Sequence, residues 1–270
     1  MYSMNSTASK NWVDSHFHVF HAAESMAGAR YVPHYSATQA DWQAQAAQVG
    51  VYRGVCVQPS FLGTDNHLML QALKTHPQLL RGVAVVAADT PTAVLRDMHA
   101  SGVRGIRLNL SGVSHDIPEW TGADALWQTL HELGWHVEVH TDQGGLPHVL
   151  TQLPTQVPLV VDHMAKPEQA RASDATIRAL VQRAARSPTF VKLSGAYRLG
   201  ALDAVTLAHI WCQALGAHAV LWGSDWPCTN HEHLADYNAL FAALKTWVGA
   251  EHMDQVLCEN PERLYGFQAS

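Results

Sequence analysis

The stretch AQAAQVGVYRGVCVQPS, residues 44–60, joins an amphipathic helical segment to a short strand-like segment through Gly50. Glycine adopts a positive φ without steric cost, which suits the residue that follows the end of a helix. The same helix–glycine–strand order recurs around three further glycines, Gly102, Gly134 and Gly216. Repetition of this unit is typical of parallel strands connected by helices.

Eight strand-like segments can be counted, and most are continuous apolar runs, as expected of parallel strands covered on both faces. They lie near residues 12–18, 53–60, 81–87, 103–110, 136–140, 158–163, 189–195 and 219–225. This spacing predicts a (β/α)8 barrel in which residues 1–270 form a single domain and residues 1–10 a flexible tail. Residues 19–37 are expected to form a loop over the strand ends. A doubly wound open sheet is the alternative, but HVFHAAES, after the first strand, is not a glycine-rich phosphate loop.

The composition excludes several classes of partner. A net charge of −6 with no basic run argues against binding to nucleic acid or to an anionic membrane surface. The N-terminus has no apolar leader and no run reaches transmembrane length, so a cytoplasmic protein is predicted. The 18 histidines outnumber the 17 lysines and arginines, which points to metal or proton chemistry. The nine tryptophans suit either a contact in a homo-oligomer or the mouth of a substrate site.

Polar side chains gather where the predicted strands end. In WVDSHFHVF, residues 12–20, strand alternation places His16, His18 and Asp14 on one face. The active site of a (β/α)8 barrel lies at the C-terminal ends of its strands, and desolvating so many ionisable groups there is costly. We therefore predict a common pocket. The other strand ends contribute Gln58, Ser60, Arg107, Asn109, Glu138, His140, Asp162, His163, Lys192, Ser194, Arg198 and Asp225.

Three of these positions have competing interpretations. In VVDHM, residues 160–164, His163 shares a face with Val161, so His163 is expected to point into the pocket and Asp162 outward. Arg107 either meets an anionic substrate or forms a structural ion pair. Asp225 either caps a helix or, facing imidazoles or a cation, stays ionised and accepts a proton from water as a general base.

Seven segments occur in order and cover almost the whole chain: DSHFH, VQPSFLGTDN, GVRGIRLNL, VVDHMAKP, KLSGAYR, LWGSDWP and ENPERLYGF. Taken together, they resemble the amidohydrolase superfamily, in particular its branch of 2-pyrone-4,6-dicarboxylate lactonase-like proteins. The resemblance implies a (β/α)8 barrel that hydrolyses a small lactone or a related ester-like ring.

The same resemblance implies a role for each site residue. His16, His18 and His163 would polarise the ring carbonyl, and Asp225 would activate the water. The residues expected to contact a small, anionic substrate are Ser60, Arg107, His140 and Arg198, the arginines holding a carboxylate by forked hydrogen bonds.

The chain departs from that branch at two places. The run NLSGVSHDI lacks the second arginine that relatives carry soon after the counterpart of Arg107, and His140 stands where they have tyrosine. A lactone with one carboxylate or several hydroxyls is therefore as compatible with the sequence as a dicarboxylate.

The resemblance leaves the need for a metal open. Many amidohydrolases bind one or two divalent ions through residues that correspond to His16, His18, His140 and Asp225, a ligand set that suits zinc or manganese. The lactonase-like branch, however, resembles proteins that can work without metal, and no organic cofactor is expected. Two alternatives share the barrel: a metal-dependent decarboxylase of an aromatic or muconate-like acid, and a non-catalytic metal- or ligand-binding protein.

Overall fold

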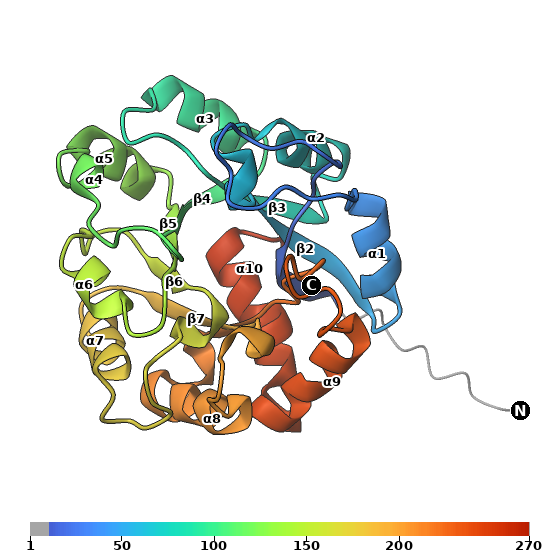
Figure 1. Cartoon of the computed structure of the whole chain (residues 1–270), viewed down its shortest axis with the longest axis vertical. Coiled ribbons are helices and arrows are strands. Elements are labelled where there is room, and N and C mark those ends of the chain that lie inside the picture. The colour runs from blue at the N-terminus through green and yellow to red at the C-terminus, as the bar shows by residue number, and fades with distance from the viewer. Residues whose placement is uncertain (1–10, 270) are drawn as a thin grey trace, which may run out of the picture.

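A computed structural model describes residues 11–269 and confirms the predicted (β/α)8 barrel. Its eight parallel strands pair in chain order, and Phe17 bridges Trp226 just beyond the last strand, so that the sheet nearly closes on itself. Figure 1 shows the strands at the centre with the helices around them. The strands are β1 (Trp12–Phe17), β2 (Val51–Val57), β3 (Leu80–Ala84), β4 (Val103–Asn109), β5 (His136–His140), β6 (Leu159–Val161), β7 (Thr189–Leu193) and β8 (Val220–Trp222).

The helices connect successive strands and cover the outside of the barrel. They are α1 (Gln39–Ala47), α2 (His67–Thr75), α3 (Thr92–Ala100), α4 (Pro118–Thr121), α5 (Asp124–Glu132), α6 (Leu146–Leu150), α7 (Ala175–Ala184), α8 (Ala204–Leu215), α9 (Tyr237–Val248) and α10 (Asn260–Tyr265). Single 3₁₀ turns form at η1 (Ser60–Leu62), η2 (His163–Ala165), η3 (Ala196–Arg198), η4 (Ala217–Ala219) and η5 (Ala250–His252), and η6 (Gln255–Glu259) is π-helical.

The glycines of the repeated unit have the predicted backbone conformation. Gly50, Gly102, Gly134 and Gly216 have φ of 80°, 104°, 65° and 80°. Residues 1–10, predicted to form a flexible tail, lie outside the described residues, and a single domain over residues 1–270 stays a prediction. None of the helices within residues 11–269 has the length and hydropathy of a transmembrane span.

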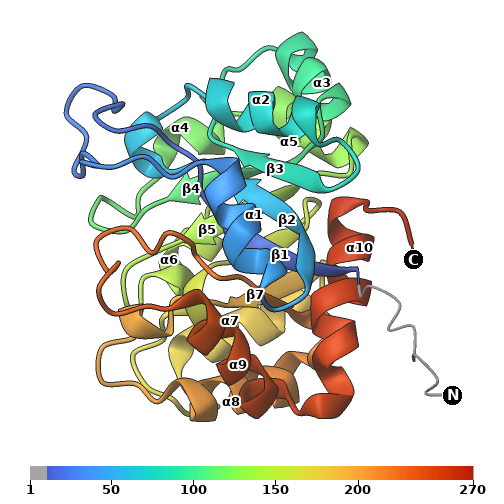
Figure 2. The same ribbon diagram turned by 90° about the vertical axis from the view of Figure 1, so that its right-hand side faces the viewer.

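An apolar cluster joins strand residues to the C-terminal segment. It contains residues of the strands and of the C-terminal segment, and none from α1 to α9. Tyr265 of α10 is fully buried in it. Figure 2 shows α10 on one side of the molecule and the long loops on the other. The buried members are Val13, Val55, Val57, Val83, Val160, Phe190, Leu221, Tyr265 and Phe267.

A bulge in β1 overturns one expectation about its face. The pairing of β1 with β2 shifts between Asp14 and Phe17, so strict alternation fails there. Asp14 consequently points out of the barrel, where its carboxylate accepts hydrogen bonds from Trp42 Nε1 (2.9 Å) on α1 and Tyr237 Oη (3.1 Å) on α9. The expectation that Asp14 shares the face of His16 is therefore wrong. Asp14 instead joins β1 to the loop after β8, because Ser224 Oγ donates to it at 2.6 Å.

Candidate active site

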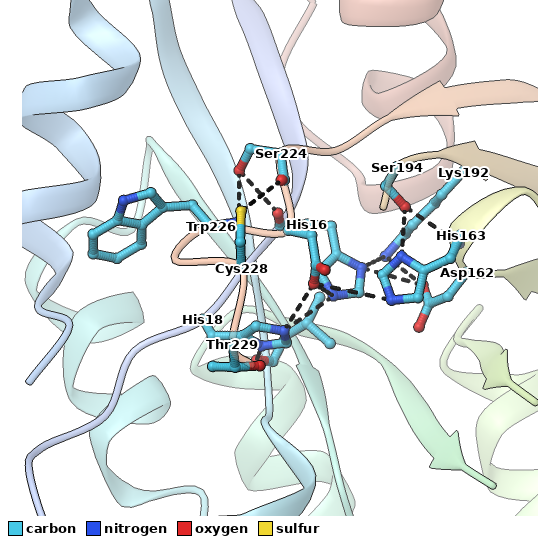
Figure 3. A network of polar contacts seen from close by, with 12 residues as sticks. His16, His18, Asp162, His163, Lys192, Ser194, Ser224, Trp226, Cys228 and Thr229 are labelled. Carbon is cyan, nitrogen blue, oxygen red and sulfur yellow. Dashed lines mark hydrogen bonds and ion pairs between the residues drawn. The ribbon is translucent and has the colours of Figure 1, made fainter. Parts of the chain in front are cut away.

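The predicted site residues come together around one cavity of about 190 Å³ at the C-terminal ends of the strands. His18, Ser60, Arg107, His140, His163, Arg198 and Asp225 all line it, and His16 is fully buried beside them. Figure 3 shows His16 with His18 on one side and Asp162, His163 and Lys192 on the other. The other lining residues are Arg30, Tyr31, Pro59, Phe61, Asn109, Ser111, Thr229 and Asn230.

Asp225 is the carboxylate at the centre of this site. Its Oδ1 lies 3.5 Å from His16 Nε2, 3.4 Å from His18 Nε2 and 3.9 Å from His163 Nε2. Its Oδ2 accepts hydrogen bonds from Tyr197 Oη (2.7 Å) and Arg198 Nε (2.8 Å). Burial raises the pKa of Asp225, but the charge of Arg198 and the imidazoles outweigh it and hold that pKa well below its usual range. Asp225 is therefore ionised near neutral pH.

The imidazoles around Asp225 are oriented by their other ring nitrogens. His18 Nδ1 donates to the carbonyl of Val57 at 2.7 Å, which turns His18 Nε2 toward Asp225. His16 Nδ1 lies 3.2 Å from Asp162 Oδ1 and 3.2 Å from Lys192 Nζ. Burial lowers the pKa of His16 to about 3, more than the charge of Asp162 raises it, so His16 is neutral at physiological pH.

Three of these atoms have the spacing of a metal site. His16 Nε2, His18 Nε2 and Asp225 Oδ1 are separated by 3.3, 3.5 and 3.4 Å. Ligands about 2.0–2.1 Å from a tetrahedral zinc ion lie about 3.3–3.4 Å apart. Two imidazole nitrogens and one carboxylate also form a common donor set for such ions. These three residues can therefore bind a divalent ion.

His140, expected as a further metal ligand, does not join this group. Neither does it belong to the second set of converging donors within residues 11–269, His16, Asp162 and His163. Both ring nitrogens of His140 are buried without a hydrogen-bond partner, and its ring lies 4.5 Å from that of His163, between centroids. Its position in the cavity lining suits a substrate contact.

Asp162 points into the barrel, so the expectation that it turns outward is wrong. Its Oδ2 accepts hydrogen bonds from Arg107 Nη2 (2.9 Å) and Nε (3.1 Å). The expectation assumed that strand alternation continues through His163. However, β6 ends at Val161 and His163 has a φ of 50°, so the chain turns and both side chains face the site. His163 itself is held by Ser194, whose Oγ lies 3.0 Å from His163 Nδ1.

A buried ionic network supports the cavity from below. Lys192 Nζ lies 2.5 Å from Glu138 Oε2 and 3.6 Å from Asp162 Oδ1, and Arg107 Nε lies 3.8 Å from Glu138 Oε1. The structural ion pair considered for Arg107 is thus present, although Arg107 also lines the cavity. Sequence reasoning missed the pairing of Glu138 with Lys192. Its signal is the opposite charges at inward-facing positions of β5 and β7.

Glu232, in the loop after β8, connects that loop to the loop of residues 19–37, and both loops contribute residues to the cavity lining. The carboxylate of Glu232 accepts hydrogen bonds from Tyr31 Oη (3.0 Å) and Tyr35 Oη (2.7 Å), which belong to the loop of residues 19–37. Tyr31 lines the cavity. No strand or helix periodicity marks these residues, and this is why sequence reasoning missed them. The prediction that residues 19–37 form a loop on the side of the strand ends is confirmed.

Loss of the hydrogen bonds that Glu232 accepts from Tyr31 and Tyr35 should weaken substrate binding more than it slows the chemical step. For Glu232→Ala we expect KM to rise about fivefold, equivalent to about 1 kcal/mol of lost loop ordering, with kcat nearly unchanged because Asp225 and its imidazoles are untouched. Steady-state kinetics with a hydrolysed lactone measures both constants. Glu119→Ala, an exposed carboxylate on α4, is the control. Equal KM values for the two variants would show that the loop does not depend on Glu232.

Comparison with known proteins gives a consistent set of relatives. Residues 13–267 match the model of the amidohydrolase family. The chain is 32% identical to a 2-pyrone-4,6-dicarboxylate hydrolase of Comamonas testosteroni, over 94% of this chain and 89% of the relative. It is 27% identical to a 4-sulfomuconolactone hydrolase of Rhizobium radiobacter, with the same coverage of both chains, 94% and 89%.

A solved structure agrees with these relatives. The crystal structure of a probable 2-pyrone-4,6-dicarboxylic acid hydrolase from Acinetobacter baumannii, with citric acid bound, superimposes with a TM-score of 0.83. It is 32% identical in sequence, and the match covers 95% of this chain and 100% of that one. The similarity therefore extends over the barrel and the loops that build the cavity.

Proposed function

The chain belongs to the amidohydrolase family, and from this premise we propose that it hydrolyses the ester bond of a small carboxylated or hydroxylated lactone. The observation that carries the proposal is the ionised Asp225, which faces three imidazoles in a cavity whose wall also holds arginines. Lactone hydrolysis needs a base for the water and a positive environment for the developing oxyanion, and this cavity contains both. A decarboxylase is not favoured, because the relatives at 27–32% sequence identity over 94% of the chain are lactone hydrolases.

In the proposed step, Asp225 accepts a proton from water as the water oxygen attacks the ring carbonyl. His163, together with His16 and His18, stabilises the negative charge that develops on the carbonyl oxygen. The ring C–O bond then breaks, the former ring oxygen takes up a proton, and the product is an open-chain hydroxy acid or its tautomer. Asp225 is suited to this because its low pKa keeps it ready to accept the proton.

The remaining lining residues would bind and orient the substrate. Arg107 and Arg198 each use part of their guanidinium group on a buried carboxylate, and we propose that their other N–H groups contact the substrate. Ser60 supplies a hydroxyl and His140 its two unpartnered ring nitrogens. Holding the ring in one orientation lowers the entropic cost of the attack.

We further propose that His16, His18 and Asp225 bind one divalent ion, zinc or manganese, as the spacing of their donor atoms suggests. When bound, such an ion polarises a carbonyl oxygen and lowers the pKa of a coordinated water. The hydrogen bond from His18 Nδ1 to the carbonyl of Val57 would hold the ring in the orientation that this role needs.

Removing the ion is expected to lower the rate of lactone hydrolysis at least about tenfold, because the carbonyl polarisation that a bound ion would supply is lost. Elemental analysis should find about one zinc or manganese ion per chain in wild type and much less in His18→Asn. His209→Asn, on the exposed face of α8, is the control and should keep the ion. If the protein, freed of the ion by a chelator, hydrolysed lactones at the wild-type rate, the proposed role of the ion would be wrong. The imidazoles would then be the groups that stabilise the oxyanion.

The proposed function is tested with a panel of lactones that differ in charge. Ring opening of carboxylated, sulfonated and neutral hydroxylated lactones is followed by release of acid, with carbon dioxide measured in parallel on aromatic and muconate-like acids. We expect acid release from at least one lactone and no carbon dioxide. Carbon dioxide release without ring opening would assign the site to a decarboxylase, and the absence of both would contradict an enzyme of either kind.

A further inference from the structure

Three arginines line the cavity, and two of them are already paired with carboxylates. Arg107 Nη2 lies 2.9 Å from Asp162 Oδ2, and Arg198 Nε lies 2.8 Å from Asp225 Oδ2. Arg30 also lines the cavity but forms no ion pair with any carboxylate of residues 11–269. Of the three cavity arginines, Arg30 is therefore the one whose positive charge no acidic side chain of residues 11–269 compensates.

The contacts of Arg30 fix the position of its guanidinium group but do not neutralise its charge. Its Nη1 donates a hydrogen bond to the carbonyl of Ser111, in the loop that follows β4. It also packs against Gly112, which has a φ of 73°, and a Cβ there would lie 2.6 Å from Arg30 Nη1. A carbonyl is a neutral acceptor, so Arg30 keeps its charge and its remaining N–H donors for another group.

The loop that carries Arg30 is anchored beside it. The neighbouring Tyr31 donates to Glu232 at 3.0 Å and packs edge-on against Phe61, with ring centroids 5.5 Å apart. Both Tyr31 and Phe61 line the same cavity. The guanidinium group is thus held at the cavity by its neighbours on both loops, while Asp225 and its imidazoles lie at the buried base.

We propose that Arg30 binds a carboxylate of the substrate and so selects anionic lactones over neutral ones. This inference rests on the proposed function, because it names the charge of the substrate that the same cavity accepts. A guanidinium group binds a carboxylate through two parallel N–H···O bonds, which adds direction to the attraction. The bound carboxylate lies near the Ser111–Gly112 turn, and the ring carbonyl is directed toward Asp225 at the base.

The test compares a lactone carboxylate with its neutral methyl ester, made at that carboxylate, in wild type, Arg30→Met and Arg30→Lys. Arg30→Met should lower kcat/KM for the carboxylate about tenfold or more, the effect of losing a charged hydrogen bond, and change it less than about twofold for the ester. Arg30→Lys should fall between, because it keeps the charge and loses the planar fork. Arg30 is exposed on a loop, so both variants should fold. Arg96→Met, an arginine on α3 with a 62% exposed side chain, is the matched control.

Two results would overturn the inference: equal losses of kcat/KM for carboxylate and ester in Arg30→Met, or no loss for either. A wild-type protein that opens no lactone would instead contradict the proposed function. In that case calorimetry with citrate, a small carboxylate held by a related structure, still decides the role of Arg30. A dissociation constant about tenfold weaker in Arg30→Met supports anion binding by Arg30, and an unchanged constant overturns it.

Discussion

Replacing the central carboxylate by its amide, Asp225→Asn, is expected to lower kcat about a thousandfold, because an amide does not accept the proton of the attacking water. The side chains have nearly the same shape, and the asparagine oxygen still accepts the hydrogen bonds that Tyr197 and Arg198 donate to Asp225. The fold and the cavity should therefore persist. Single-turnover kinetics gives the rate of the chemical step, and calorimetry gives substrate affinity, which should stay within about tenfold of wild type.

Tyr197→Phe is the matched control for this change. It removes one hydrogen bond to Asp225 Oδ2 but leaves the carboxylate and its pairing with Arg198. We expect kcat to fall only about tenfold, roughly the effect of one hydrogen bond to a charged group. If Asp225→Asn retained kcat within about tenfold of wild type, the water would have to be activated by another group, and the assignment of Asp225 as base would be wrong.

The second large effect is expected on stability, at the network below the cavity. Lys192 and Glu138 are both fully buried and lie 2.5 Å apart. Lys192→Met removes the nearest cation from the buried Glu138 carboxylate and leaves Arg107 Nε at 3.8 Å and the imidazoles of His16 and His136 at 3.7 and 3.8 Å. The free energy of unfolding should therefore fall by about 3–5 kcal/mol. Chemical denaturation measures this difference, with circular dichroism as the probe.

The double variant tests the cause of that loss. Adding Glu138→Gln to Lys192→Met removes the uncompensated charge and should recover about 2 kcal/mol or more. Arg96→Met breaks an exposed pair with Glu132, whose side chains are 62% and 46% exposed, and should cost less than about 1 kcal/mol. A loss in Lys192→Met that the second change does not relieve would point to lost packing rather than to the buried charge.

Much of the fold could be predicted because its signals are local and repeated. Gly50 and its three equivalents mark helix ends wherever a positive φ is needed, and apolar runs mark the strands that follow. The clustering of His16, His18, His163 and Asp225 follows from this, since the ends of parallel strands in a barrel meet on one side.

The errors lie where the backbone departs from regular strand geometry. The predicted orientation of Asp14 is wrong because β1 contains a bulge, and that of Asp162 is wrong because the chain turns after Val161. Neither irregularity has a signal in residue type alone. Arg30, Tyr31 and Glu232 reach the cavity from loops, whose positions depend on tertiary contacts rather than on periodicity.

Tyr265 of α10 is fully buried against strand residues and does not line the cavity at the strand ends. On the proposed function, the lactone and its product would therefore enter and leave on the side of the loop of residues 19–37, whose Tyr31 lines the cavity. The opened acid carries one more negative charge than the lactone, so its release would have to overcome attraction to Arg30, Arg107 and Arg198.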